Sequence, residues 1–228
     1  MIVALAASVA GALPAAAQRS QRAQPVQATP NNDLWLTTVA SIEYQIDPQW
    51  SFHLESQLQV DTNISRLRVL QVRPGFEYAF SRHWAAAAGY VQFQRYPAGM
   101  GTQRGPFQDL LARGQVGKVN FAGRLRTEEL FYESSALLIR TRALAGIRLP
   151  IGDTPWEFAA SDEIFVNLKV DNTGRQAGLH QNRLYAGFGR PLGHHVKMSA
   201  GYQLDTFERD GIFRNTHEIR IGLAFRLN

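Results

Sequence analysis

The sequence contains no cysteine, and it lacks the motifs and charge blocks that define several common classes of protein. The absence of cysteine excludes disulfides and thiolate zinc sites, although 228 residues are enough to bury a core without them. No G-x-x-x-x-G-K phosphate loop and no G-x-S-x-G nucleophile motif are present. The net charge of +5 is spread along the chain without a block of Lys or Arg, so we expect no nucleic-acid partner. We expect no metal ion and no cofactor either.

The chain also has no apolar run long enough for a membrane-spanning helix, which needs about 20 residues. Its clearest apolar run covers residues 2–13 and is followed by a proline and an A-x-A cleavage pattern at residues 15–17. This arrangement predicts a cleaved secretory signal peptide over residues 1–17, although no Lys or Arg precedes the apolar run. Residues 18–32 are polar and Gln-rich, so we expect a disordered mature N-terminus there. The folded domain is predicted over residues 33–228.

From Asp33 onward the chain has no convincing helical pattern, but it alternates between apolar and polar residues with the period of a β-strand. The clearest case is the segment 50–61, in which Trp50, Phe52 and Leu54 share one face while His53 and Glu55 lie on the other. Turn residues separate the segments. The predicted strands are 33–44, 50–61, 65–80, 84–95, 106–117, 119–131, 136–149, 155–167, 179–191, 195–207 and 215–227.

The connections between these segments alternate in character, which is the pattern of an up-and-down meander. One set is short, and the other set is longer and more polar, as at the two rims of an outer-membrane barrel. Trp50, Trp84, Phe121 and Trp156 each follow a short connection, with separations of 34, 37 and 35 residues. We therefore expect these four aromatic residues to lie at one rim and to form the girdle that such barrels place at the lipid interface.

The predicted fold class is all-β: a single up-and-down antiparallel transmembrane β-barrel. Alternation alone does not separate a membrane barrel from a soluble one. The face opposite the charged one carries Ala, Thr and Gly as often as Leu, which would make a poor soluble core, so we favour the membrane barrel. We expect 12 strands, with 10 as the alternative, because bacterial single-chain barrels have even numbers.

A ladder of charges on two neighbouring predicted strands is the main candidate for a functional site. In the sequence RLRTEELFYESSALLIRTR, residues Arg124, Arg126 and Glu128, and then Arg140 and Arg142, recur at every second position and so share one face. We expect this face to point into the lumen and the array to continue on nearby strands. The full predicted lumen network is Arg124, Arg126, Glu128, Arg140, Arg142, Arg148, Glu157, Glu163 and Arg183.

This network allows two interpretations. A salt-bridge network would fill a narrow barrel and close it, whereas a lumen with excess Arg would attract anions. Six arginines against three glutamates would leave an excess of positive charge. Both interpretations depend on the strand register, because a shift of one residue moves every side chain to the other face.

A series of short motifs along the chain is similar to a known family. The motifs are DLW at 33–35, VRPGFEY at 72–78, RLRTE at 124–128, RTR at 140–142, DEIF at 162–165, HQNRLYAGFG at 180–189 and GYQL at 201–204. Their order resembles the uncharacterised bacterial outer-membrane β-barrel family, domain of unknown function 2490. Its Arg-x-Arg-x-Glu-x-Arg pattern is matched at Arg124, Arg126 and Glu128 and departs at Leu130. The resemblance implies an outer-membrane barrel and no established activity, so no catalytic residue is carried over.

The sequence therefore predicts an exported protein of the cell outer membrane. We expect a narrow anion-preferring small-solute pore or a closed structural barrel. The alternative is a lipid-modifying enzyme with a site at the extracellular rim near His180 or His217, although an enzyme is the less favoured class. A soluble periplasmic β-barrel binding protein comes third. The expected partners are outer-membrane lipid and small anionic solutes, and the expected state is a monomer.

Overall fold

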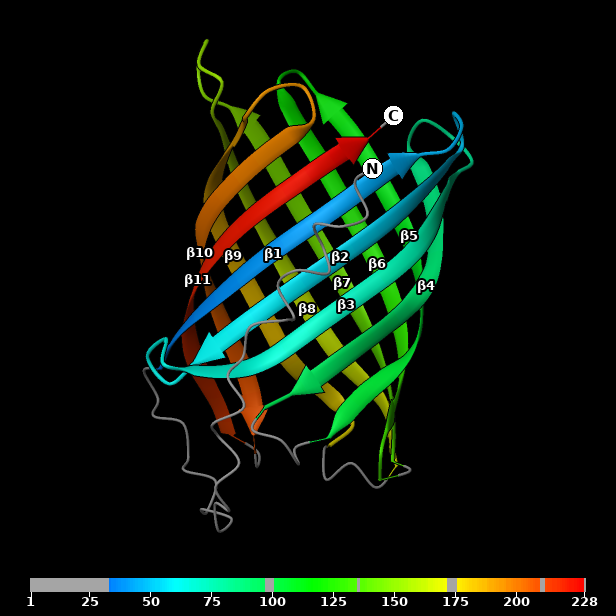
Figure 1. Ribbon diagram of the computed structural model, residues 1–228, viewed down its shortest axis with the longest axis vertical. Coiled ribbons are helices and arrows are strands. Elements are labelled where there is room, and N and C mark those ends of the chain that lie inside the picture. Colours follow the sequence, from blue (N-terminus) through cyan, green and yellow to red (C-terminus); the bar gives the residue numbers. More distant parts are fainter. Residues whose placement is uncertain (1–32, 97–100, 135, 172–175, 210–211, 228) are drawn as a thin grey trace, which may run out of the picture.

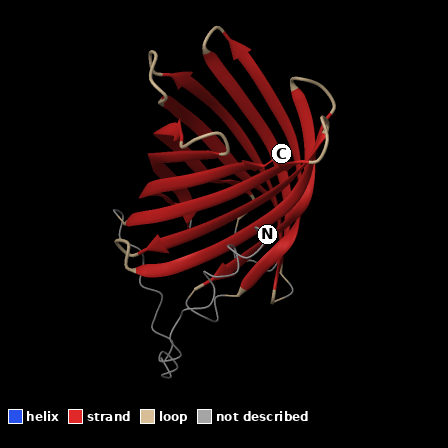
Figure 2. Ribbon diagram, turned by 45° about the horizontal axis from the view of Figure 1, so that its top comes forward, coloured by secondary structure: helices blue, strands red, loops and turns tan. Residues whose placement is uncertain are grey.

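The computed structural model describes residues 33–96, 101–134, 136–171, 176–209 and 212–227, and in these residues the chain forms a closed barrel of eleven strands (Figure 1). Figure 2 shows that strands alone make up the wall. No helix in the described residues is long and apolar enough to cross a membrane. The strands are β1 Leu34–Gln45, β2 Trp50–Asp61, β3 Arg66–Ala79, β4 Trp84–Arg95, β5 Thr102–Val116, β6 Val119–Tyr132, β7 Leu137–Pro150, β8 Glu157–Asp171, β9 Gly178–Pro191, β10 Val196–Arg209 and β11 Ile212–Leu227.

The predicted strand number of 12, and the alternative of 10, are both wrong. Each strand pairs antiparallel with the next, and β1 closes the barrel by pairing parallel with β11, from Leu34 opposite His217 to Tyr44 opposite Leu227. In Figure 1 the arrows of β1 and β11 point to the same rim. A parallel ladder also satisfies the backbone groups of both edge strands, so an odd number of strands can close.

All eleven segments predicted as strands are strands in the structure, but several extend further than their alternation indicated. β5 begins at Thr102 rather than at residue 106, and β11 begins at Ile212 rather than at residue 215. As a result the predicted difference in loop length is wrong, because the strand bounds leave two to six residues between strands at either rim. The predicted signal peptide and disordered N-terminus, residues 1–32, lie outside the described residues.

The outer wall of the barrel is apolar. Outward side chains such as Phe76, Leu184 and Phe188 are 52%, 54% and 51% exposed, and they are part of a large set of exposed hydrophobic residues that covers the strands. A monomeric soluble protein seldom exposes so much continuous apolar surface, whereas a barrel in lipid presents an apolar band of this kind.

The four aromatic residues predicted as a girdle lie at one rim, which we call the aromatic rim. Trp50 and Trp84 are the first residues of β2 and β4, Phe121 is the third residue of β6, and Trp156 directly precedes β8. All four are 38–47% exposed. The rim where these strands end is called the opposite rim. β1 starts at the opposite rim, and β11 ends at the aromatic rim.

At the opposite rim, Asp33 fixes the start of β1 to the turn between β2 and β3. Its buried carboxylate accepts hydrogen bonds from Trp35 Nε1 at 2.7 Å, Asn63 N at 2.8 Å and Thr62 N at 3.2 Å. Thr62, Asn63 and Ile64 all have positive φ, between 52° and 61°. This conformation is unfavourable for residues with a Cβ, so the hydrogen bonds to Asp33 offset backbone strain in the turn.

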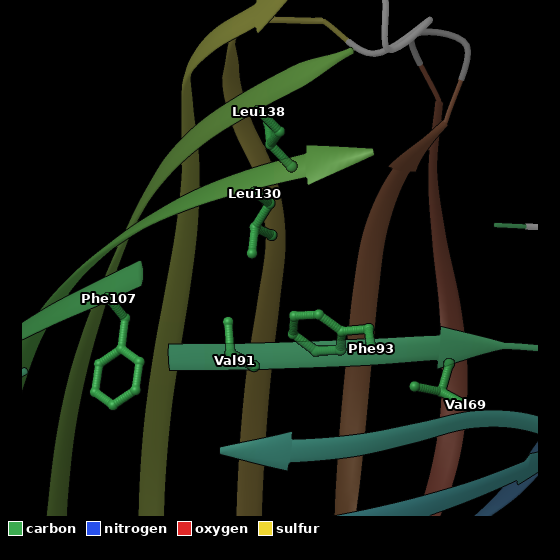
Figure 3. Packing of buried hydrophobic residues seen from close by; sticks show 6 residues of the cluster. All are labelled: Val69, Val91, Phe93, Phe107, Leu130 and Leu138. Carbon is green, nitrogen blue, oxygen red and sulfur yellow. The ribbon is translucent and has the colours of Figure 1, made fainter. Parts of the chain in front are cut away.

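In the half of the lumen towards the opposite rim, strands β3 to β7 contribute a cluster of apolar side chains, the apolar plug, which Figure 3 shows, and the other strands contribute buried polar residues such as Gln59, Gln203 and Asp205. Leu130 and Leu138, on the paired strands β6 and β7, are fully buried there. Leu130 occupies the position where the resemblance predicted an arginine, and it therefore extends the apolar plug rather than the charged ladder. The members of the plug are Val69, Val91, Phe93, Phe107, Leu130 and Leu138.

Candidate functional site

The charged ladder on β6 and β7 lies inside the barrel. Arg126, Glu128 and Arg142 are buried, whereas the intervening outward residue Leu125 is 49% exposed. The antiparallel register places Arg126 opposite Arg142 and Glu128 opposite Arg140. Strand pairing alone therefore brings three guanidinium groups next to one carboxylate.

Glu128 is the centre of this arrangement. One carboxylate oxygen, Oε2, accepts a hydrogen bond from Arg140 Nε at 2.6 Å, and Oε1 accepts one from Arg142 Nη1 at 3.0 Å. Arg73 Nη2 and Arg126 Nη1 lie 3.5 and 3.9 Å from Oε1. Arg73 belongs to β3, so Glu128 on β6 connects two strands that β4 and β5 separate in the wall. The carboxylate has no solvent exposure, and a buried charge needs such partners to be tolerated.

Glu163 on β8 forms a second centre. Arg142 binds it through two hydrogen bonds of 3.0 Å, from Nε and Nη2, and so bridges Glu128 and Glu163. Arg124 Nη2 donates to Glu163 Oε1 at 2.6 Å, and Arg183 Nη1 lies 4.0 Å from Oε2. The structure thus unites seven of the nine predicted network residues.

The other two predicted members, Arg148 and Glu157, lie apart at the aromatic rim. Arg148 is 63% exposed and is 3.8 Å from Glu157. Glu157 binds Lys197 more closely, at 2.5 Å. This pair belongs to the entrance of the lumen and not to its buried network.

Several members of the network were not predicted from the sequence. Arg126 makes a two-pronged contact with Asp109, at 2.6 and 2.5 Å, Glu55 accepts from Arg73 at 2.8 Å, and Asp205 lies 3.4 Å from Arg183 Nε. Asp109 stands on the same face of β5 as Phe107 and Leu111, and that period-two spacing was the signal that could have identified it. With these residues the connected network contains six arginines and five carboxylates.

Two phenylalanine rings pack against the guanidinium groups. The guanidinium carbons of Arg142, Arg183 and Arg140 lie 4.5, 4.8 and 5.4 Å from the centroid of the Phe165 ring. Phe107 has Arg126 at 4.5 Å. Such contacts favour a cation over the ring face, and they limit the positions that the side chains can adopt.

Glycines on β3 and β4 leave the space that Phe107 occupies. A Cβ at Gly89 would lie 2.7 Å from the Phe107 ring, and a Cβ at Gly75 would lie 3.0 Å from it. The two glycines face each other in the ladder between β3 and β4. Because these glycines have no side chains, the Phe107 ring can occupy the position in which Arg126 packs against it.

Between the network and the aromatic rim lies a cavity of about 590 Å³, which we call the vestibule. Its mouth is formed by the ends of several strands, where Arg148 and Arg226 are exposed. Its deepest residues are Arg73, Phe107 and Arg126, at the base of the network. Six basic and four acidic residues line it, apart from three histidines.

Within the part of the chain that the structure describes, the histidines considered for an enzyme do not form a catalytic triad. His217 lies on the outer wall of β11 and contacts the Tyr202 hydroxyl, and His180 Nδ1 lies 4.0 Å from Glu208. Inside the barrel, Ser51 Oγ and Glu77 both approach the same nitrogen of His53, Nε2, at 2.8 and 3.5 Å. A triad needs the acid on the other ring nitrogen.

Among the described residues, no three His, Asp or Glu side chains gather in a way that could hold a metal ion.

A closed, mostly antiparallel barrel with an apolar outer wall and a charged lumen is porin-like. A solved structure of the NanC porin is similar to it with a TM-score of 0.54 and 15% identity, over 86% of this chain and 99% of that one. The chain belongs to the family described as protein of unknown function, DUF2490, whose model matches residues 32–216. Comparison with curated proteins gives no match.

Proposed function

We propose that the protein is a narrow, anion-preferring channel of the outer membrane, held closed in this structure by the arginine–carboxylate network and the apolar plug. The observation that carries this proposal is the buried hub at Glu128, where one carboxylate meets four guanidinium groups. Cations in excess along a narrow lumen favour anions, as rings of Arg and Lys do in selective pores.

The proposed location in the outer membrane rests on three features. The outer wall is apolar, four aromatic residues gather at one rim, and the N-terminal sequence has the pattern of a secretory signal. The similarity to a porin agrees with this location. A soluble binding barrel would place its charges outside, whereas here the outer wall is apolar and the lumen holds buried charges beside the apolar plug.

The proposed closed state rests on burial of lumen side chains around the whole circumference. Glu128, Asp205 and Glu218 come from β6, β10 and β11, and none of the three has solvent exposure. A barrel of about eight strands is just filled by its own side chains, and wide channels need about sixteen. Eleven strands leave room for a vestibule, and buried side chains, including those of the network and the plug, occupy the lumen beyond it.

Conductance of the detergent-folded barrel in a planar bilayer under a salt gradient tests this proposal. We expect rare, small steps with an anion-selective reversal potential. The double variant Leu130→Ala/Leu138→Ala removes part of the apolar plug, so we expect larger or more frequent steps of the same selectivity. The control Leu125→Ala lies on the same strand but faces outward, and it should leave the steps unchanged.

Charge reversal at the entrance tests the selectivity separately. Arg148→Glu/Lys197→Glu changes two side chains at the vestibule mouth that are 63% and 35% exposed, so the fold should tolerate the change. We expect the reversal potential to move towards cations. Cation selectivity of the unaltered protein, or silence of the plug variant after verified insertion, would refute the proposal.

A further inference from the structure

We infer that the base of the vestibule is a binding site for small organic anions that carry a carboxylate or phosphate group next to an apolar body. The inference rests on the anion preference proposed above and adds to it a defined site and ligand class. It is carried by three arginines, Arg73, Arg124 and Arg126, that line the vestibule and each keep one buried N–H group without a hydrogen-bond partner.

Each of these arginines donates to one carboxylate and keeps one further N–H donor unused. Arg126 donates hydrogen bonds from Nε and Nη2 to Asp109, while its Nη1 has no hydrogen-bond partner. Arg73 donates a hydrogen bond from Nη1 to Glu55, while its Nε has no hydrogen-bond partner. Arg124 donates one from Nη2 to Glu163, while its Nε has no hydrogen-bond partner. Buried donors are nearly always satisfied in folded proteins, so three unused donors on arginines that line one cavity favour binding of an acceptor there.

Two of the three guanidinium groups converge, and the third lies on the same face of β6. Arg73 Nη2 and Arg126 Nη1 both lie within 4 Å of the same oxygen of Glu128, and both guanidinium groups lie over the ring of Phe107. Arg124 precedes Arg126 by two residues on β6 and so points into the lumen from the same face. Glu128 shows which chemistry this cluster accepts, because a carboxylate already lies at its inner side.

Apolar residues form part of the other wall of the vestibule, next to Glu77 and Asp109, and they select the body of the ligand. Gly75, Ala87, Phe107 and Leu111 line it on β3, β4 and β5. A volume of about 590 Å³ lies within the range of small-molecule sites, roughly 300–1,000 Å³. A ligand that directs its acidic group to the arginines would place an aromatic or aliphatic body against this wall.

The mouth of the vestibule would steer anions inward. Three basic residues, Arg148, Lys197 and Arg226, lie there with two acidic ones, Glu43 and Glu157. Like-signed charges around a cleft raise the local concentration of the opposite charge and its rate of association.

Binding of phenyl phosphate to the detergent-folded protein, measured by calorimetry and by ³¹P NMR, tests the site. We expect saturable binding that is stronger than binding of inorganic phosphate, because only phenyl phosphate contacts the apolar wall. Arg124→Gln should weaken it roughly tenfold or more, the effect of losing one charged contact. The matched control is Arg220→Gln, because Arg220 also points into the lumen and is 24% exposed against 20% for Arg124, but does not line the vestibule.

A second variant, Leu111→Trp, fills the vestibule without changing charge and should abolish binding. Heat-dependent gel mobility shows which variants are folded. Absence of saturable phenyl phosphate binding, or equal loss in Arg220→Gln and Arg124→Gln, would overturn the site. Binding in a barrel that never conducts would refute the channel alone, and anion conductance without binding would refute the site alone.

Discussion

Glu128 shows how much of the lumen depends on a single side chain. Its carboxylate is fully buried and neutralises arginines from β3, β6 and β7. The sequence predicts its contact with Arg140 and Arg142, because alternation puts all three on one face of neighbouring strands. It does not predict Arg73, because a contact across the lumen depends on barrel curvature and on the space left by glycines, which no local pattern encodes.

We expect Glu128→Gln to destabilise the barrel by about 3–5 kcal/mol, because the change leaves four arginines around a neutral amide in a buried site. The midpoint of urea unfolding in lipid vesicles, followed by tryptophan fluorescence, measures this effect. Glu43→Gln is the control. Glu43 pairs with Arg226 at the rim, where side-chain exposures of 30% and 70% imply a cost below about 1 kcal/mol. Equal costs for the two variants would contradict the role of Glu128 as the hub.

Asp33 supports a strained turn in the same way, through a single carboxylate. Asp33→Ala leaves the amides of Thr62 and Asn63 and the indole N–H of Trp35 without their acceptor. We expect a loss of about 1–3 kcal/mol in stability and faster hydrogen exchange at these two amides. NMR measurement of amide hydrogen exchange at Thr62 and Asn63 in micelles checks the predicted increase in exchange rate.

The control for Asp33 is Asp47→Ala, which also removes a carboxylate that accepts two backbone N–H groups in a turn, those of Gln49 and Trp50. That turn is exposed, so water replaces the acceptor and exchange should change only locally. Unaltered exchange at Thr62 and Asn63 in the Asp33 variant would show that the turn holds its conformation without this carboxylate.

At the scale of the strand, the period of two was a reliable guide to which residues form the wall and a poor guide to where strands end. β6 and β7 alternate strongly, and their charged face was predicted residue by residue. β5 begins with Thr102, Gln103, Arg104 and Gly105, which include no apolar side chain, so these four residues looked like part of a loop. Its beginning is fixed by pairing with β4, as in Thr102 opposite Gln94, a tertiary contact that the local sequence does not show.

Gly105 provides a test of close strand packing. A Cβ at this position would lie 1.7 Å from the carbonyl oxygen of Glu129, on the backbone of β6. We therefore expect Gly105→Ala to separate β5 from β6 locally and to reduce the folded fraction seen by heat-dependent gel mobility. Gly114→Ala on the same strand is the control, because its Cβ would meet no atom within 4 Å. Comparable folding of the two variants would contradict this account.

At the scale of the whole molecule, the number of strands was the prediction that failed. The alternating segments were counted correctly as eleven, and the expectation of an even number was imposed on them from other bacterial barrels. The direction of the first and last segments already implied that they run parallel. What the sequence could not show is that a parallel ladder of eleven residue pairs would close the wall.

Cysteine cross-linking tests this closure, because the chain has no native cysteine that could form competing disulfides. Thr38 on β1 lies opposite Ile221 on β11, and both side chains point outward. Paired residues of neighbouring strands fall within the Cα separations that a disulfide spans, about 4.4–6.8 Å. We expect Thr38→Cys/Ile221→Cys to form a cross-link visible as a gel shift. Thr38→Cys/Gly222→Cys places the two thiols on opposite faces of the wall, so we expect no cross-link in this variant. A cross-link in this second variant alone would refute the register.

The parallel closure has a consequence for the topology of the chain in a membrane. In an up-and-down barrel with an even number of strands, both chain ends emerge on the same side. Here residue 33 lies at the opposite rim and residue 227 at the aromatic rim, so reporter groups attached before one and after the other would face different compartments. A barrel inserted from one side must therefore translocate one end of its chain across the bilayer before the first and last strands can meet.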